Sequence, residues 1–131
     1  MAKTVQQTAV LLASPDRLFD MYLDPKQHAA ITGADVSISS QPGAEFKAFN
    51  GVLSGRILTV TPKRMIVQTW RSSHWRADDL DSILILTFDH DGAGGGIELV
   101  HVNVPDHDYD GVNEGWEKFY WMPWRRYLEA R

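Results

Sequence analysis

The chain has 131 residues, of which 44% are hydrophobic and 23% are charged; these values are typical of a globular domain and exclude a disordered or fibrous chain. Its 13 Lys and Arg against 17 Asp and Glu give a net charge of -4, which opposes the phosphate neutralisation on which nucleic-acid binding depends. We therefore expect a single domain over residues 1–131 and no nucleic-acid partner.

Cysteine is absent, which excludes disulfides, thiolate metal ligands and a cysteine nucleophile, and fits a reducing compartment. No apolar run approaches the roughly 20 residues that a membrane-spanning helix needs, and the N-terminus lacks the apolar region of a signal peptide. We expect a cytoplasmic protein without membrane insertion, whose oligomeric state the sequence leaves open.

The first part of the chain predicts a strand followed by two short helices. Residues 4–12 mix polar and branched apolar side chains, which favours a strand. Ser14 is a typical helix N-cap, and Pro15 after it costs nothing at the first helical position. Asp24 begins a second helix in the same way, and Gly33 ends it.

From residue 34 the spacing of apolar residues changes from a period near 3.6 to a period near 2 for about 70 residues, which predicts consecutive antiparallel strands. Asn50-Gly51 is a strong signal for a tight hairpin turn. Residues 72–81 are too polar for a strand and too many for a tight turn, so we expect a mobile loop there. The predicted strands are 34–39, 45–49, 52–61, 64–71, 82–90 and 96–104.

The last segment, residues 112–129, carries aromatic residues at helical spacing and predicts a long helix. Pro123 lies inside it and removes one backbone hydrogen bond, so we expect the helix to bend there. The element order therefore predicts an α+β fold in which an antiparallel sheet of six to seven strands packs against one long C-terminal helix.

Local motifs narrow this fold to a family. The strand that ends in Trp70-Arg71 follows a turn at Pro62, a later strand runs from Gly96 to His101, and Gly115-Trp116 opens the last helix. Together these segments resemble the branch of the START superfamily that is homologous to the activator of the heat-shock protein 90 ATPase. The resemblance implies the helix-grip fold, in which a curved sheet wraps round the last helix.

The resemblance also implies a use for the space between helix and sheet. A strongly curved sheet and one helix leave a gap that large side chains must either fill as core or line as a cavity. We expect non-catalytic binding of a small hydrophobic molecule there, without a cofactor. The candidate lining residues are Phe46, Trp70, Leu84, Leu86, Phe88, Leu99, His101, Trp116, Phe119 and Tyr120.

Two other functions stay open. A chaperone is a possible partner, as the resemblance implies, and Trp75 in the polar loop is then an exposed contact residue. A cyclase- or hydrolase-like enzyme is a third hypothesis, with His101 or the loop residues His74 and Arg76 as its reactive groups. The sequence contains no Gly-x-Ser-x-Gly, Walker or His-Glu-x-x-His motif to support that hypothesis.

Two acidic and imidazole clusters invite comparison with metal sites. Residues 89–91 and residues 106–108 both read Asp-His-Asp. The first cluster is typical of a turn between strands, and the second precedes a helix, whose dipole favours acidic residues. We therefore expect no metal site at either cluster.

Overall fold

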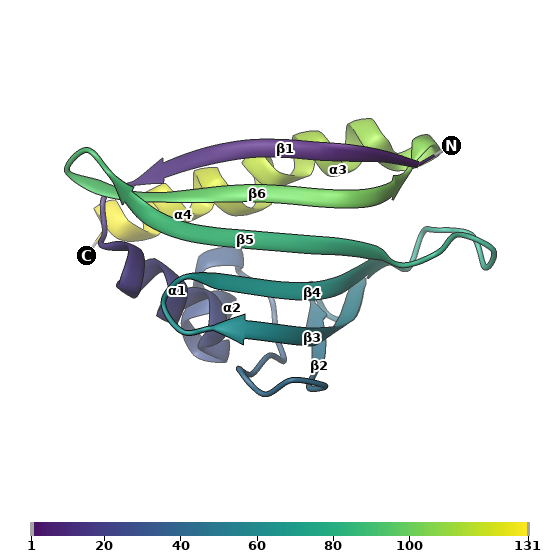
Figure 1. The fold of residues 1–131 in the computed structure, drawn as a ribbon, viewed down its shortest axis with the longest axis horizontal. Helices are drawn as coiled ribbons and strands as arrows, with labels where there is room; N and C mark the ends of the chain where they lie inside the picture. Colours follow the sequence, from purple (N-terminus) through teal and green to yellow (C-terminus); the bar gives the residue numbers. More distant parts are fainter. Residues whose placement is uncertain (1, 131) are drawn as a thin grey trace.

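The protein is described by a computed structural model that covers residues 2–130. Two short helices separate the first strand from the rest of the sheet (Figure 1). The strands are β1 (Ala2–Leu11), β2 (Glu45–Ala48), β3 (Leu53–Thr61), β4 (Met65–Ser72), β5 (Ser82–Asp91) and β6 (Gly94–Pro105). The helices are α1 (Pro15–Leu23), α2 (Pro25–Thr32), η1 (Asp106–Asp108), α3 (Tyr109–Trp116), η2 (Glu117–Trp121) and α4 (Met122–Glu129).

The strands form an antiparallel sheet in the order β1-β6-β5-β4-β3-β2, which has six strands within residues 2–130. Consecutive strands from β2 to β6 pair with each other, and β1 returns to pair with β6. The helical segment from α3 to α4 runs across one face of the sheet, with α1 and α2 beside it (Figure 1). This arrangement confirms the predicted α+β class and the long C-terminal helix.

Alternation along the strands separates an inner face from an outer face. Every second residue of β4, and of β5 as far as Phe88, is buried, which places Leu84, Leu86 and Phe88 on the inner face together. Leu99 and His101 of β6 are buried on the same face. The period-2 signal of the sequence therefore predicted correctly which side chains enter the core.

The helix starts follow the predicted capping residues. Ser14 accepts a hydrogen bond from the Arg17 backbone N–H at 3.2 Å, and Asp24 accepts one from Lys26 at 2.9 Å. Each cap satisfies a donor that has no partner inside its helix. Across residues 2–130, no helix combines the length and the apolar character that crossing a membrane requires.

Two predicted elements differ from the structure. Residues 34–39 form no strand; they make only an isolated bridge between Ser37 and Lys47, because β2 offers just four residues for pairing. The tight turn expected at Asn50-Gly51 is a longer loop, because the last residues to pair are Ala48 and Leu53. Phe49 and Val52 thus belong to the loop rather than to the strands.

The C-terminal helix begins at Tyr109 and contains a π-helical turn, η2, which ends at Trp121, two residues before Pro123. The Met122 backbone N–H bonds to the carbonyl of Glu117, five residues earlier. Pro123 has no N–H to continue the ordinary pattern, so the irregular turn lies where the sequence predicted a disturbance.

Candidate functional site

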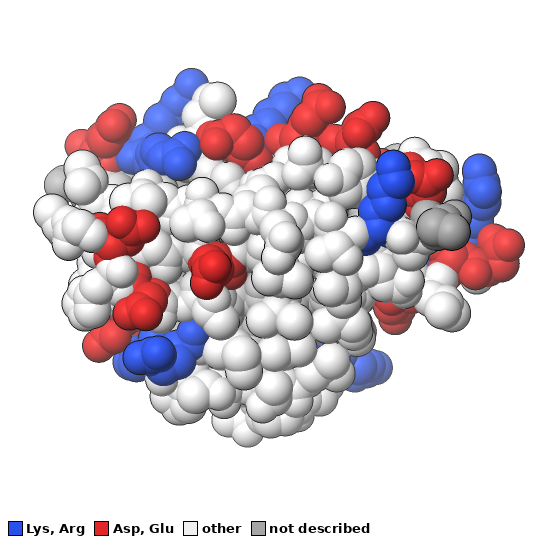
Figure 2. Space-filling model, turned by 45° about the horizontal axis from the view of Figure 1, so that its top comes forward, with Lys and Arg blue, Asp and Glu red and all other residues white. Residues whose placement is uncertain are grey.

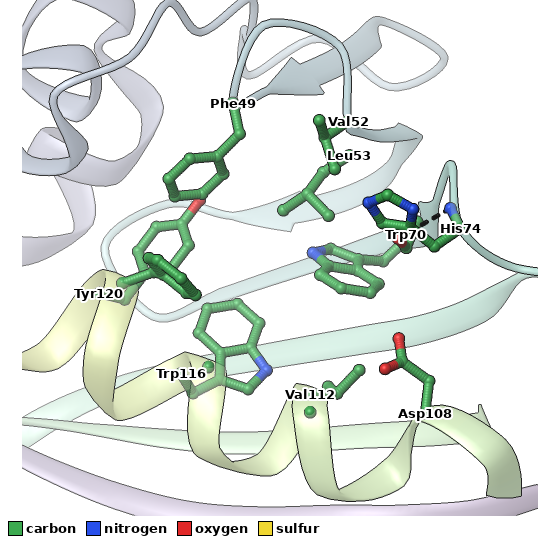
Figure 3. Close-up of a pocket in the computed structure, with 13 residues that line it drawn as sticks. Phe49, Val52, Leu53, Trp70, His74, Asp108, Val112, Trp116 and Tyr120 are labelled. Carbon is green, nitrogen blue, oxygen red and sulfur yellow. Dashed lines mark hydrogen bonds between the residues drawn. The ribbon is translucent and has the colours of Figure 1, made fainter.

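A cavity of about 360 Å³ lies between the C-terminal helix and the strand ends near the β2–β3 loop (Figure 3). Its wall is mostly apolar, and aromatic rings from the loop, from β4 and from the helix face one another across it. The lining residues are Phe49, Val52, Leu53, Trp70, Ser72, His74, Asp108, Gly111, Val112, Gly115, Trp116, Phe119 and Tyr120.

Two helix glycines leave room for this cavity. Gly111 and Gly115 are four residues apart in α3, so they lie on one face of the helix, and both line the cavity. A side chain at Gly111 would also meet the Asp108 carboxylate, since a Cβ there would come within 2.7 Å of Oδ1. Each glycine inside a helix lowers helix stability by about 1 kcal/mol relative to alanine. The two glycines therefore open the cavity and destabilise the helix.

The β2–β3 loop supplies another part of the wall. Phe49, Asn50 and Gly51 have positive φ angles of 51°, 56° and 89°, which turn the chain sharply and place Phe49 at the cavity. The Phe49 ring packs edge-on against Phe119, with ring centroids 5.7 Å apart. Phe119 is 47% exposed, so this aromatic pair lies where the cavity meets solvent.

The predicted lining residues separate into two groups. Trp70, Trp116, Phe119 and Tyr120 line the cavity. The remaining residues, each at most 1% exposed, belong to the core and are not among the lining residues: Phe46, Leu84, Leu86, Phe88, Leu99 and His101. The inner face of the sheet is therefore packed at these six residues, and the cavity lies near the β2–β3 loop.

His101 holds two cavity indoles in place. Its Nδ1 accepts from Trp116 Nε1–H at 3.2 Å, so its Nε2 carries the proton and donates to Ser82 Oγ at 2.7 Å. The Ser82 hydroxyl in turn donates to the Trp70 carbonyl at 2.6 Å. Burial lowers the pKa of His101 to about 3, so the ring is neutral and both nitrogens are used inside the protein.

A second buried histidine supports Tyr120. His28 Nδ1 donates to the Tyr22 carbonyl at 2.8 Å, which leaves Nε2 to accept from the Tyr120 hydroxyl at 2.8 Å. The Tyr22 hydroxyl donates to Gln68 Oε1 at 2.5 Å. Burial lowers the pKa of His28 to about 4 and raises the pKa of both tyrosines, so this network is uncharged.

The polar end of the cavity is formed by Ser72, His74 and Asp108. Ser72 Oγ accepts from the His74 backbone N–H at 3.2 Å, the dashed line in Figure 3. The expectation that Trp75 is exposed is wrong. Its side chain is 7% exposed, packs against Trp70 at 5.6 Å and donates from Nε1 to Asp108 Oδ2 at 2.7 Å.

The loop that contains Trp75 is tied to β4 by one arginine. Arg71 donates to the carbonyls of Arg76 and Asp79 at 2.5 and 2.6 Å and pairs with the Asp81 carboxylate at 3.2 Å. This anchor explains how a polar segment can hold Trp75 against the core.

The two Asp-His-Asp clusters take part in local hydrogen bonds. Asp89 accepts from the His90 backbone N–H at 2.8 Å, as in a turn. His107 Nε2 lies 2.7 Å from Asp79 Oδ2, and this contact is the largest cause of the lowered pKa of Asp79. Among residues 2–130, no group of three or more His, Asp or Glu side chains could hold a metal ion.

Several lining residues were missed by sequence reasoning. Gly111 and Gly115 were available as a signal, since two glycines one turn apart in a helix leave its surface open. Phe49 and Val52 could not be assigned, because alternation does not give the length of the loop between two strands.

Residues 12–129 match the family model described as activator of Hsp90 ATPase homolog 1-like protein. The chain belongs to this family. Its curated relatives include an activator of 90 kDa heat shock protein ATPase homolog from Dictyostelium discoideum, 27% identical over 117 residues. An uncharacterized protein from Schizosaccharomyces pombe is 28% identical over 111 residues. These matches cover 88% and 85% of this chain but 30% and 33% of the relatives, so the chain spans about a third of their length.

Solved structures share the fold of this family member. An HSP90 activator from Plasmodium falciparum superposes with a TM-score of 0.85 at 19% identity, covering 96% of each chain. A protein from Mesorhizobium loti superposes with a TM-score of 0.84 at 20% identity, covering 98% of each chain. The Aha1 dimer from Colwellia psychrerythraea reaches 0.75 at 12% identity, covering 89% of this chain and 90% of the other. These likenesses show that the chain has the helix-grip fold.

Proposed function

We propose that this START-like domain, spanning residues 1–131, binds a small hydrophobic molecule without catalysis in the cavity between the C-terminal helix and the sheet. The observation that carries the proposal is the cavity itself, whose volume of about 360 Å³ lies within the roughly 300–1,000 Å³ of small-molecule sites. Its aromatic wall favours an apolar occupant. Gly115 supports this use, because a Cβ there would make only an ordinary contact with Phe119 and stability alone would favour a larger residue in the helix.

The polar groups near the cavity fit a binding role. His101 and His28 use both ring nitrogens in internal hydrogen bonds and are neutral, so they position Trp116 and Tyr120 rather than exchange protons with a ligand. Among the described residues, neither lysine nor arginine lines the cavity. A neutral ligand therefore suits the site better than an anion.

Filling the cavity from the helix tests the proposal. Gly115→Leu should abolish binding of the apolar fluorescent probe N-phenyl-1-naphthylamine, because the new side chain enters the cavity, while leucine suits the helix better than glycine. Glu114→Leu is the matched control: it adds the same side chain at an exposed neighbouring position. Equal probe affinity in wild type and Gly115→Leu, or no saturable binding to wild type, would contradict the proposal.

A second function, contact with a chaperone, is favoured by the family and by the outer face of the sheet. The outward residues Val67, Ile85 and Val100 are half-buried neighbours across β4, β5 and β6. Figure 2 shows the side of the molecule on which β1 and β6 lie in front; charged side chains gather along its borders, and its centre carries few. Such a surface fits a protein partner, and a chaperone of the Hsp90 type would place the domain in the cytoplasm.

This second function has its own test. A purified Hsp90 should bind the domain or change its rate of ATP hydrolysis when the domain is added. Val100→Glu should weaken this effect and Gly115→Leu should leave it unchanged, since Val100 lies on the outer face of the sheet and Gly115 lies in helix α3 beside the cavity. An ATP hydrolysis rate and a binding isotherm that do not respond to the wild-type domain would rule this function out.

A further inference from the structure

Three indole rings lie at or beside the cavity, and they differ in the state of their N–H groups. Trp116 Nε1–H donates to His101, and Trp75 Nε1–H donates to Asp108. Trp70 Nε1–H is buried and has no hydrogen-bond partner among residues 2–130. A buried donor without a partner is costly, so it calls for an explanation.

The Trp70 ring is held so that it cannot easily find a partner by turning. It packs edge-on against His101 with ring centroids 4.7 Å apart, and against Trp75 at 5.6 Å. Its own backbone carbonyl accepts the hydrogen bond from Ser82. The surroundings therefore fix both the backbone and the ring, and the orientation of the N–H follows from them.

The direction of this N–H is what matters for the cavity. In Figure 3 the Trp70 nitrogen lies on the side of the indole that faces Leu53 and Trp116, which are both lining residues. The nitrogen is covered by its neighbours, so a bound molecule reaches it only when a wall side chain moves. Leu53, which follows directly on the loop of residues 49–52, is the wall side chain beside this face of the indole (Figure 3).

We propose that the ligand is a flat aromatic molecule with a neutral hydrogen-bond acceptor, such as a ketone oxygen, which accepts from Trp70 Nε1–H. This inference rests on the function proposed above. Flat rings suit a wall that includes Phe49, Trp116 and Tyr120, which can stack against the faces or edges of a planar molecule. A neutral acceptor suits a site where the Asp108 carboxylate opposes a second negative charge.

A matched pair of compounds tests the acceptor. Fluorenone and fluorene have nearly the same size and planarity, but only fluorenone carries a ketone oxygen. In competition with N-phenyl-1-naphthylamine, wild type should bind fluorenone about tenfold more tightly than fluorene. Trp70→Phe should bind the two compounds equally, because phenylalanine keeps an aromatic ring but has no N–H.

Trp124→Phe is the matched control. Trp124 is also buried with an unpartnered Nε1–H, but it does not line the cavity. This variant should therefore keep the tenfold preference for fluorenone. If Trp70→Phe and Trp124→Phe both lost the preference for fluorenone over fluorene, the proposal would be overturned. The loss would then come from removing any buried indole and not from removing the Trp70 N–H.

A second readout needs no variant. The Trp70 indole proton resonance of the wild-type protein should move downfield on addition of fluorenone and not on addition of fluorene. Equal affinities for the two compounds together with an unmoved Trp70 resonance would overturn the acceptor proposal while leaving the cavity function intact. Absence of binding by both compounds and by the fluorescent probe would overturn both.

Discussion

A chain of hydrogen bonds through His101 links four elements around the site at the level of single atoms. The chain from Trp116 to His101, Ser82 and the Trp70 carbonyl joins the helix to β6, β5 and β4. Every member is buried, so each donor depends on the next acceptor in the chain. His101 is therefore a structural support of the cavity wall.

Ser82→Ala tests this role. The substitution removes the acceptor of His101 Nε2–H and the donor to the Trp70 carbonyl, so the free energy of unfolding should fall by about 1–3 kcal/mol. Urea denaturation measures the change, with the exposed Ser73→Ala as control, for which we expect less than about 0.5 kcal/mol. A loss for Ser82→Ala no larger than the control's would contradict the hydrogen-bond chain.

The same burial predicts how stability depends on pH. His28 and His101 have folded-state pKa values of about 4 and about 3, below the ordinary value of 6.5. Between pH 6.5 and these folded-state pKa values, the unfolded chain therefore binds more protons than the folded chain. The stability that the neutral histidines contribute is fully present above pH 6.5 and is lost as the pH falls through this range.

Each histidine should contribute a slope of up to about 1.4 kcal/mol per pH unit within that window. Urea denaturation at pH 7, 6 and 5 measures the slope, and His28→Gln should reduce it by about half. An unfolding free energy that stays constant from pH 7 to pH 5 would show that these histidines are not buried as neutral rings.

At the scale of elements, β3 lies unusually close to β4 at Gly55, two residues after the cavity residue Leu53. A Cβ on Gly55 would come within 1.9 Å of the Thr69 backbone oxygen, so only glycine fits there. The pairing register of the two strands shifts a few residues later, between Ile57 and Thr59. This close approach helps to set where the β2–β3 loop meets the helix.

Gly55→Ala should lower the free energy of unfolding by at least about 3 kcal/mol, because a backbone atom cannot move aside as a side chain can. Gly51→Ala is a useful comparison: it has no atom within 4 Å but has a φ of +89°. We expect it to cost about 1 kcal/mol. Equal losses in the two variants, measured by thermal or urea unfolding, would contradict the close packing of β3 on β4.

Element-level patterns also explain which site residues could be predicted. Alternation correctly placed Leu84, Leu86 and Phe88 on one face of their strand, but it cannot tell a residue in the packed part of that face from one beside a cavity. Trp116 and Tyr120 are buried toward the sheet, as their size and helical spacing favour, whereas Phe119 on the same helix is 47% exposed. Trp75 was misjudged because its neighbours are polar, although Asp108 and Arg71 hold it inward.

At the scale of the molecule, the sequence predicted the fold more completely than it predicted the residues that line the cavity. Capping residues, strand alternation and the order of elements are local signals that agree with one another, so they specify the helix-grip architecture. The cavity depends on the difference between the space enclosed by sheet and helix and the volume of the side chains in it. Gly111 and Gly115 indicate an open helix surface in the sequence, but the cavity also needs the β2–β3 loop with Phe49 and Val52, whose course appears only after packing.

The central claim is that the space between helix and sheet accepts a small apolar molecule. Titration of the ¹⁵N-labelled protein with fluorenone, followed by amide resonances, tests it most directly. We predict saturable shifts confined to residues 49–53, 70–74 and 108–120, the segments that line the cavity. Shifts that do not saturate, or that map to the outer face around Val67, Ile85 and Val100, would contradict the claim.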